Sequence, residues 1–281
     1  MSVFHSGERR LQKRAGVAES LAQNSERFIF KALPTQHQQF YPLLPLIFVA
    51  AIDCQQQLWA SVLWGTHGFV RASDAKQLRI HALPNLTDPL YEQLSPHTPI
   101  GILGLEFPTR RRNRANGIIS TVDATGFTVQ VEQCFGNCSK YIQTRSPTLL
   151  KRPISNALSI TPALNEQQAY FIQNMDTFFI ASTWQQQVDI SHRGGKSDFI
   201  KIENPKTLYV PDYTGNNYFN TLGNLVLNSQ ASLLFIDFEN GDLLHLAVTV
   251  DVIWQGEQRG MRLHIHEVRQ RALALPIAWK T

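Results

Sequence analysis

A turn rich in hydrogen-bond donors lies at Asp189-Ile-Ser-His-Arg-Gly-Gly-Lys196 in the second half of the chain. Ser191 offers a hydroxyl, Arg193 a planar guanidinium and Lys196 a point charge. The two glycines between the cations let backbone amides approach a ligand closely. Donors that converge in this way suit a phosphate or an electron-rich heterocycle. A solvated hairpin tip, kept soluble by its two cations, accounts for the same residues.

A second polar stretch, Pro211–Leu225, contains four asparagines and two threonines and precedes an apolar segment. Residues 220–227 predict a short helix. Its free amides and the positive end of its dipole would then lie near Asn217 and Thr221, where they favour an anion. Ordinary cap and turn chemistry explains the same composition, because asparagine is common in both.

The densest charge run is Arg110-Arg-Arg-Asn-Arg114. We rank a solvated or salt-bridged hairpin turn first among its interpretations. A clamp for the phosphate of a ligand is the second interpretation. A nucleic-acid contact ranks last, because no aromatic side chains for base stacking lie beside the arginines.

Two further patterns concern metal or redox chemistry. Cys134 and Cys138 form a CxxxC spacing without the second pair that a zinc site needs, so two half-buried thiols are favoured over a switchable disulfide. His264 and His266 share one face of a predicted strand, where a surface pair is commoner than a metal site. No metal site is therefore predicted.

The elements that must position these residues are mostly short strands. Glu8–Glu26 predicts an amphipathic helix with a basic outer face. Phe48–Ile52 with Leu58–Leu63, and Gly117–Thr121 with Gly126–Glu132, predict two β-hairpins. A second helix is predicted at residues 165–175, after a start signal that combines a threonine and a proline.

The second half of the chain repeats the pattern of the first. Asp198–Lys201 aligns with Gly68–Arg71, and Ser232–Phe238 aligns with Gly101–Phe107. The landmark phenylalanines in these pairs are 38 positions apart in the first half and 39 in the second. We therefore expect two related β-rich halves, offset by about 130 residues.

Composition limits the class of protein. The chain has 281 residues, 43% hydrophobic and 17% charged, which excludes a disordered chain and a disulfide scaffold. Its net charge of +4 permits an anionic small molecule. Three cysteines, no apolar run long enough for a membrane and no visible signal peptide predict a cytoplasmic protein. We predict an N-terminal half at residues 1–150, a linker at 151–164 and a C-terminal half at 165–281.

Three segments together carry a family resemblance. Residues 189–196, 212–225 and 233–246 resemble the pyridoxamine 5'-phosphate oxidase-like proteins, which are FMN-binding split barrels. Residues 110–117 and 133–142 are similar to an N-terminal segment of the longer members. The resemblance implies a mainly β fold, a β-barrel with a few helices, built as two tandem split-barrel halves. It also implies a homodimer with flavin at the subunit interface.

The resemblance also implies a cofactor site. It places Ser191 and Arg193 near the flavin ring and the turn 216–221 near the phosphate. Where many relatives have two arginines, this chain has Asn216 and Asn217, which donate hydrogen bonds but no charge. The predicted FMN-binding residues are Ser191, Arg193, Gly194, Lys196, Asn216, Asn217, Asn220 and Thr221.

The function implied is an FMN-dependent oxidoreductase that acts on a small organic molecule. A flavin supplies its own redox chemistry, so no catalytic residue is assigned. The alternative is a non-enzymatic split barrel that binds haem, another ligand or a protein partner. The axial-ligand candidates for haem are His192, His245, His264 and His266. Neither a membrane nor a nucleic acid is expected as a partner.

Overall fold

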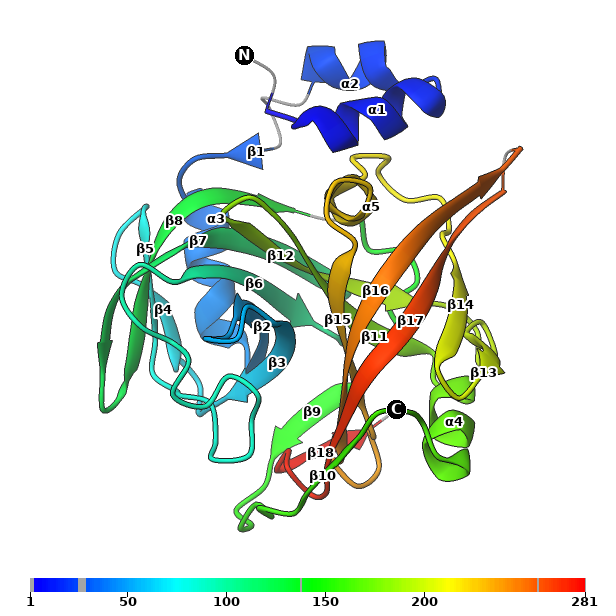
Figure 1. Ribbon diagram of the computed structural model, residues 1–281. Helices are drawn as coiled ribbons and strands as arrows, with labels where there is room; N and C mark the ends of the chain where they lie inside the picture. Colours follow the sequence, from blue (N-terminus) through cyan, green and yellow to red (C-terminus); the bar gives the residue numbers. More distant parts are fainter. Residues whose placement is uncertain (1–2, 25–28, 137, 257, 281) are drawn as a thin grey trace.

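The computed structural model describes residues 3–24, 29–136, 138–256 and 258–280 (Figure 1). The N-terminal segment forms two helices, α1 (Ser6–Arg14) and α2 (Ala18–Asn24). The first half then contains β1 (Ile29–Phe30), α3 (Thr35–Phe40), η2 (Tyr41–Leu43), β2 (Leu46–Ile52), β3 (Leu58–Trp64), β4 (Val70–Ala72), β5 (Gln77–Ile80), β6 (Pro99–Glu106), β7 (Arg111–Asp123) and β8 (Gly126–Gly136).

The second half follows the same plan. It contains β9 (Ser146–Leu149), β10 (Leu158–Thr161), α4 (Glu166–Gln173), β11 (Thr177–Trp184), β12 (Gln187–Gly194), β13 (Lys201–Asn204), β14 (Thr207–Pro211), α5 (Asn220–Leu225), β15 (Gln230–Ile236), β16 (Leu243–Gln255), β17 (Gln258–Arg271) and β18 (Ile277–Lys280).

Each half forms one antiparallel sheet of eight strands. The strand orders, β3-β2-β6-β7-β8-β5-β4 and β12-β11-β15-β16-β17-β14-β13, are the same path traced twice. An extra strand, β1 or β10, pairs with the long strand β8 or β17. Among the described residues neither path closes on itself. The predicted fold class, mainly β with few helices and two tandem halves, is confirmed.

Alternation along the strands explains how the two halves pack. In β2, Ile47, Val49 and Ala51 face the core of the first half, whereas Leu46, Phe48 and Ala50 face the second half. Both faces of this strand are therefore buried, which accounts for its unbroken apolar run. The second half has its own core, built from β11 and β14–β17.

The two halves meet around a stacked pair of phenylalanines. Phe48 and Phe179 occupy equivalent positions in β2 and β11, and their ring centroids lie 3.5 Å apart with an interplanar angle of 16°. Equivalent residues in direct contact indicate an approximate two-fold relation between the halves. Turn geometry agrees, because Gln56 and Gln185, each at the tip of the first hairpin of its half, both have left-handed backbone conformations (φ 65° and 55°).

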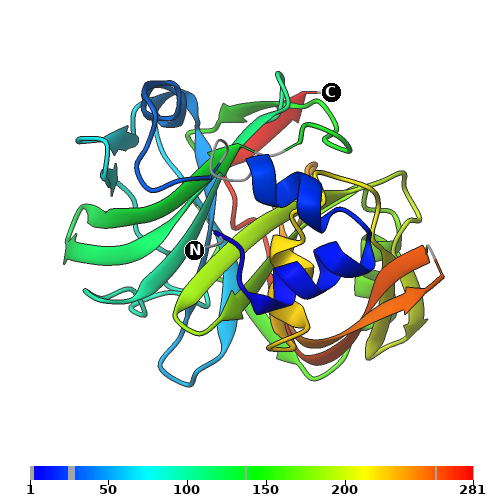
Figure 2. The ribbon, with the colours of Figure 1, turned by 90° about the horizontal axis from the view of Figure 1, so that it is seen from above.

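The N-terminal helices cover the second half (Figures 1 and 2). The imidazole of His5 caps α1 by accepting a hydrogen bond from the Gly7 amide. α1 lies so close to α5 that a Cβ added to Gly7 would be 2.1 Å from the carbonyl oxygen of Gly223. Only glycine allows these two helices to approach in this way.

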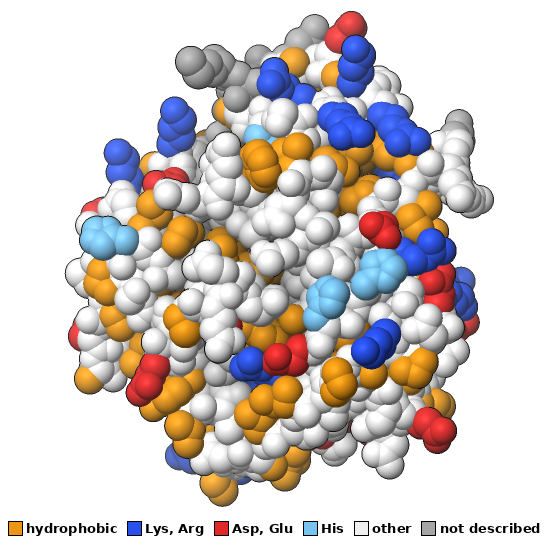
Figure 3. Space-filling model, in the orientation of Figure 1, with side chains coloured by type: hydrophobic (Ala, Val, Ile, Leu, Met, Phe, Trp, Pro, Cys, Tyr) orange, Lys and Arg blue, Asp and Glu red, His pale blue; other side chains and the backbone are white. Residues whose placement is uncertain are grey.

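The outer face of α1 is basic, as the sequence predicts, whereas α2 contains no lysine or arginine. Lysine and arginine side chains gather over the N-terminal helices on the molecular surface (Figure 3). Four of them belong to α1 and are exposed, namely Arg9, Arg10, Lys13 and Arg14.

Three expectations need adjustment. The single helix predicted for residues 8–26 is two helices, with residues 25 and 26 outside the described residues. Residues 158–161, placed in a linker, form β10 on the edge of the second sheet. Residues 146–149 pair with the C-terminal strand β18. No helix among the described residues is long and apolar enough to cross a membrane.

Candidate functional site

A pocket of about 770 Å³, a volume that includes its mouth to solvent, lies where the two halves meet. Both halves line it. The first half contributes Arg112, Arg114, Cys138, Lys140 and Tyr141, and the second half contributes Ser191, His192, Arg193, Gly194, Phe199, Pro211, Asp212, Tyr213, Gly215, Asn216, Asn217, Phe219, Asn220, Thr221, Leu222 and Arg259.

The floor of the pocket is a buried ion pair between the halves. Arg114 on β7 donates to the carboxylate of Asp189 at 2.6 Å and to the hydroxyl of Ser191 at 2.7 Å. Asn116 donates to the second oxygen of Asp189 at 3.1 Å. These side chains are almost fully buried, so the network fixes the position of Ser191 relative to the first half.

Arg112 lies two residues earlier on β7. Unlike Arg114, it has no carboxylate partner within the parts of the chain that the structure describes. Among the described residues its guanidinium bonds only to the ring and the carbonyl oxygen of His192, at 3.3 and 3.4 Å, and its Nε has no partner. Burial, followed by the charges of Arg114 and Arg193, lowers the pKa of Arg112 to about 9. It is still a cation at neutral pH. The Arg112 side chain is partly buried and has no anion beside it among the described residues, which is costly, so it favours an anionic ligand.

Burial and neighbouring cations keep the imidazole of His192 neutral. Its ring is buried, and burial together with the charges of Arg112, Arg193 and Arg145 lowers its pKa well below the usual range. Within the described parts of the chain, the Nε2 atom of this ring has no hydrogen-bond partner.

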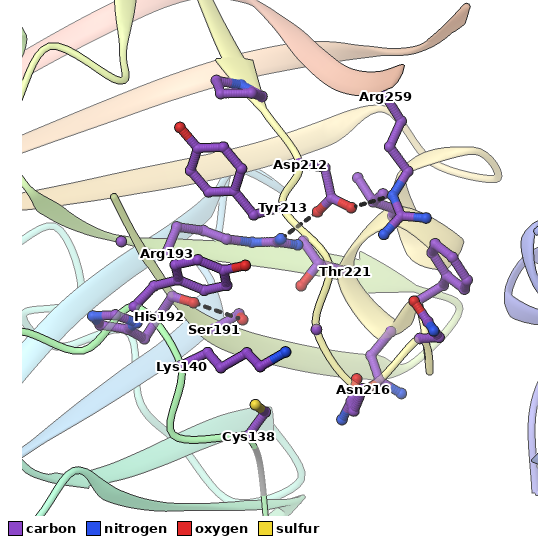
Figure 4. A pocket seen from close by; sticks show the side chains of 18 of the residues that line it. Cys138, Lys140, Ser191, His192, Arg193, Asp212, Tyr213, Asn216, Thr221 and Arg259 are labelled. Carbon is purple, nitrogen blue, oxygen red and sulfur yellow. Dashed lines mark hydrogen bonds and ion pairs between the residues drawn. The ribbon is translucent and has the colours of Figure 1, made fainter. Parts of the chain in front are cut away.

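The opposite wall is organised by one carboxylate (Figure 4). Asp212 accepts hydrogen bonds from Arg193 and from Arg259, the latter at 2.7 Å. Figure 4 shows Lys140 and Cys138, from the segment after β8, across the pocket from this group. Asp212 is the single carboxylate among the described residues that line the pocket, against five cations. The electrostatic potential inside is therefore positive.

Aromatic side chains form one side of the pocket. The rings of Tyr141 and Tyr213 lie 5.3 Å apart between centroids, at 30° to each other, and Phe199 extends the group. The segment that carries Tyr141 crosses β12 at Gly194, where an added Cβ would lie 2.1 Å from the Tyr141 carbonyl oxygen. Gly194 is thus required for the close approach of the first half to this wall.

Replacing Gly194 by Ala is expected to displace residues 138–141 and to destabilise the protein by about 1–3 kcal/mol, the usual cost of overpacking. A urea unfolding curve measures this loss. The matched control is Gly215→Ala in the same pocket, because a Cβ there meets nothing within 4 Å. Equal stability of the two variants would contradict the assigned role of Gly194.

The structure brings together most of the predicted site residues. Seven of the eight line the pocket, namely Ser191, Arg193, Gly194, Asn216, Asn217, Asn220 and Thr221. Lys196 does not: it is exposed on the turn after β12, apart from the lining residues. Its predicted part in cofactor binding has no support from this position.

The interpretation ranked first for the arginine run is wrong for two of its members. Arg111 does form a surface ion pair with Glu106 at 2.8 Å. However, β7 begins at residue 111, so Arg112 and Arg114 lie on a strand with their side chains turned into the pocket. The predicted strand began only at Gly117. Because β7 includes the arginines, strand alternation places Arg112 and Arg114 on one face and Arg111 on the other.

The other candidate residues lie in different surroundings. Cys134 is buried on β8, Cys138 lines the pocket, and both are free thiols. His264 and His266 bond to Asp251 and Thr249 on the outer face of β16 and β17. His245 is buried between the halves, and its ring bonds to the carbonyl oxygen of Ala60.

The two-fold relation gives Ser191 an equivalent in Ser61, and other side chains of the protein lie beside Ser61. Register relates Ser61 to Ser191 and His245 to Arg114. Here Ser61 donates to Asp88 at 2.5 Å, and Asp88 pairs with Arg271 at 2.6 Å, with both charged side chains at most 2% exposed. Asp88 thus occupies the second position, beside Ser61.

Comparisons with known proteins give solved structures that are similar to part of this chain at low identity. No family model matches the chain, and no curated protein matches it in sequence. A candidate pyridoxamine 5'-phosphate oxidase from Lactobacillus delbrueckii is 17% identical, with a TM-score of 0.32, over 38% of this chain and 94% of that protein. An FAD-binding protein from Mycobacterium smegmatis is 13% identical, with a TM-score of 0.29, over 41% and 98%. HupZ of Group A Streptococcus is 12% identical, with a TM-score of 0.32, over 38% and 98%.

Proposed function

We propose that the pocket between the halves binds FMN and that the protein is an oxidoreductase for a small organic molecule. The observation that carries the proposal is Arg112, a partly buried cation that has no counter-ion among the described residues and lies in a pocket that both halves line. The resemblance noted in the sequence points to the same ligand. A cytoplasmic location, inferred from the cysteine content, stays a prediction.

The residues present fit a flavin phosphate. The turn at Asn216 and Asn217 supplies hydrogen bonds without charge, and the missing positive charge comes from Arg112, Lys140 and Arg259, which line the same pocket. The Nε atoms of Arg112 and Arg193, which have no hydrogen-bond partner among the described residues, add donor capacity.

The residues also fit a flat ring. Tyr141 and Tyr213 offer an aromatic surface. The Ser191 hydroxyl and the backbone at Gly194 offer polar contacts at the edge of that surface. When bound, FMN supplies the redox chemistry, and the chain binds and orients it. All of these groups come from one chain, so a homodimer, which we still expect from the resemblance, is not needed to complete the pocket.

The test is a titration of the full-length protein with FMN and with riboflavin, which lacks the phosphate, followed by visible absorption and flavin fluorescence. We expect FMN to bind at least about tenfold more tightly, since a charge-assisted contact to phosphate contributes about 1.5–3 kcal/mol. Equal affinity for the two flavins would remove the phosphate assignment. A Soret band on adding haem, without flavin binding, would favour the non-enzymatic alternative.

A further inference from the structure

A second cavity, of about 680 Å³ with its opening to solvent included, lies behind the floor of the flavin pocket. The N-terminal segment closes it through Val3, Phe4, His5 and Glu8, while α5, β7, β8 and β12 form its other walls. Asn220 lines both cavities, and Asp189, which lines the second one, is the partner of Arg114 in the first. The two spaces are therefore neighbours on either side of one ion pair.

The chemistry of the second cavity is opposite to that of the first. Its described lining contains two carboxylates, Glu8 and Asp189, several side-chain amides and no lysine or arginine. Phe4 and Phe135 add apolar and aromatic surface. Because Asp189 is paired with Arg114, Glu8 is the carboxylate that gives this cavity its unbalanced negative charge, where the flavin pocket is cationic.

Glu8 is a buried carboxylate that forms no ion pair with a lysine or arginine among the described residues. It is 4% exposed and accepts hydrogen bonds from the His5 amide, at 2.8 Å, and from the side chain of Asn220. The imidazole of His5 lies 3.5 Å away, and burial lowers the pKa of that ring, so it adds no charge at neutral pH.

An independent observation points to a missing ligand. The Oδ1 atom of Asn116, a residue 9% exposed that lines this cavity, has no hydrogen-bond partner among the described residues, although its amide nitrogen donates to Asp189. A buried acceptor left without a donor is uncommon in folded proteins. The vacant acceptor of Asn116 and the Glu8 carboxylate both call for a group that donates hydrogen bonds, whereas Asp189 already accepts from Arg114 and Asn116.

We propose that this cavity binds a small organic cation, an amine, amidine or guanidine carried on a flat or apolar body, with Glu8 as its principal counter-charge. Such a molecule would sit next to the flavin pocket and would be the class of substrate for the proposed oxidoreductase, an extension that rests on the proposed function. Binding of the cation itself does not depend on flavin.

The experiment is a calorimetric titration of the full-length, flavin-free protein with benzamidine, a flat amidinium, and with benzamide and benzoate as neutral and anionic analogues. We expect benzamidine to bind at least about tenfold more tightly than benzamide, and benzoate not to bind. In Glu8→Gln, benzamidine affinity should fall at least about tenfold, while the exposed control Glu19→Gln should leave it unchanged.

Dependence on pH gives a readout that needs no variant. Burial and the charge of Asp189 raise the pKa of Glu8 to about 7, against contributions from its hydrogen bonds and from Arg114. Benzamidine remains cationic, so its affinity should rise as the pH increases from about 6 to about 8 and Glu8 ionises. Benzamidine that binds no better than benzamide, or with affinity indifferent to both pH and Glu8→Gln, would overturn the proposal.

The outcome is separable from that of the FMN titration. Benzamidine binding with no FMN binding would support the cation cavity and reject the flavin pocket. FMN binding without benzamidine binding would do the reverse.

Discussion

Replacing Arg112 by Ala is expected to lower the affinity for FMN by at least about 30-fold. Arg112 is a partly buried cation that faces the pocket with no anion beside it among the described residues, so a bound phosphate would be its main partner. Removing one member of a desolvated charge pair costs about 2–5 kcal/mol, and about 1.4 kcal/mol is a factor of ten. Fluorescence titration with FMN measures the change.

Arg111→Ala is the matched control on the same strand. Arg111 is exposed and pairs with Glu106 at the surface, so its loss should change FMN affinity less than about twofold. Riboflavin affinity should be nearly equal in the Arg112 variant and the wild type. The same loss in both arginine variants, or in neither, would show that Arg112 does not contact the phosphate.

Replacing Asp88 by Ala is expected to lower the free energy of unfolding by about 3–5 kcal/mol, because the buried guanidinium of Arg271 loses its counter-charge. Asp88 and Arg271 form an ion pair at 2.6 Å with both side chains nearly inaccessible to water. Without the aspartate, Thr87 is the one remaining hydrogen-bond partner of the Arg271 side chain among the described residues. Urea unfolding should show a lower midpoint with an unchanged slope.

A surface pair provides the comparison for Asp88. Asp198 and Lys201 are bonded at a similar distance, 2.6 Å, but both are more than half exposed. Asp198→Ala should therefore cost less than about 1 kcal/mol. If the two aspartate variants were equally stable, Asp88 would not be an essential buried counter-ion of Arg271 in the second position.

Local patterns predicted the fold and the second-half side of the pocket. Ser191, Arg193 and Gly194 lie at the end of one strand, and Asn216 to Thr221 lie in one polar turn, so their types and spacing were visible in two short stretches. The tandem repeat was visible because buried strands leave apolar runs of fixed spacing.

For the first half, the sequence predicted a phosphate clamp at residues 110–114 only as a second interpretation, and it did not predict Lys140 or Tyr141 at the site. Arg112, Lys140 and Tyr141 reach the pocket because the two halves pack around Phe48 and Phe179, a long-range contact that no local pattern encodes. Lys196 shows the opposite error. Its position beside Arg193 in sequence suggested a shared site, but the chain turns after Gly195 and leaves it in solvent.

Carrying both halves on one chain lets the two sides of the molecule diverge. In a dimer of identical subunits every substitution occurs twice, so a residue that closes one pocket closes its mate as well. Here Asp88 occurs once and fills one of two related positions, while the other retains Arg112 and Arg114. The expected stoichiometry is one flavin per chain, and dilution should not separate the surfaces that form the pocket, since a covalent link holds them together.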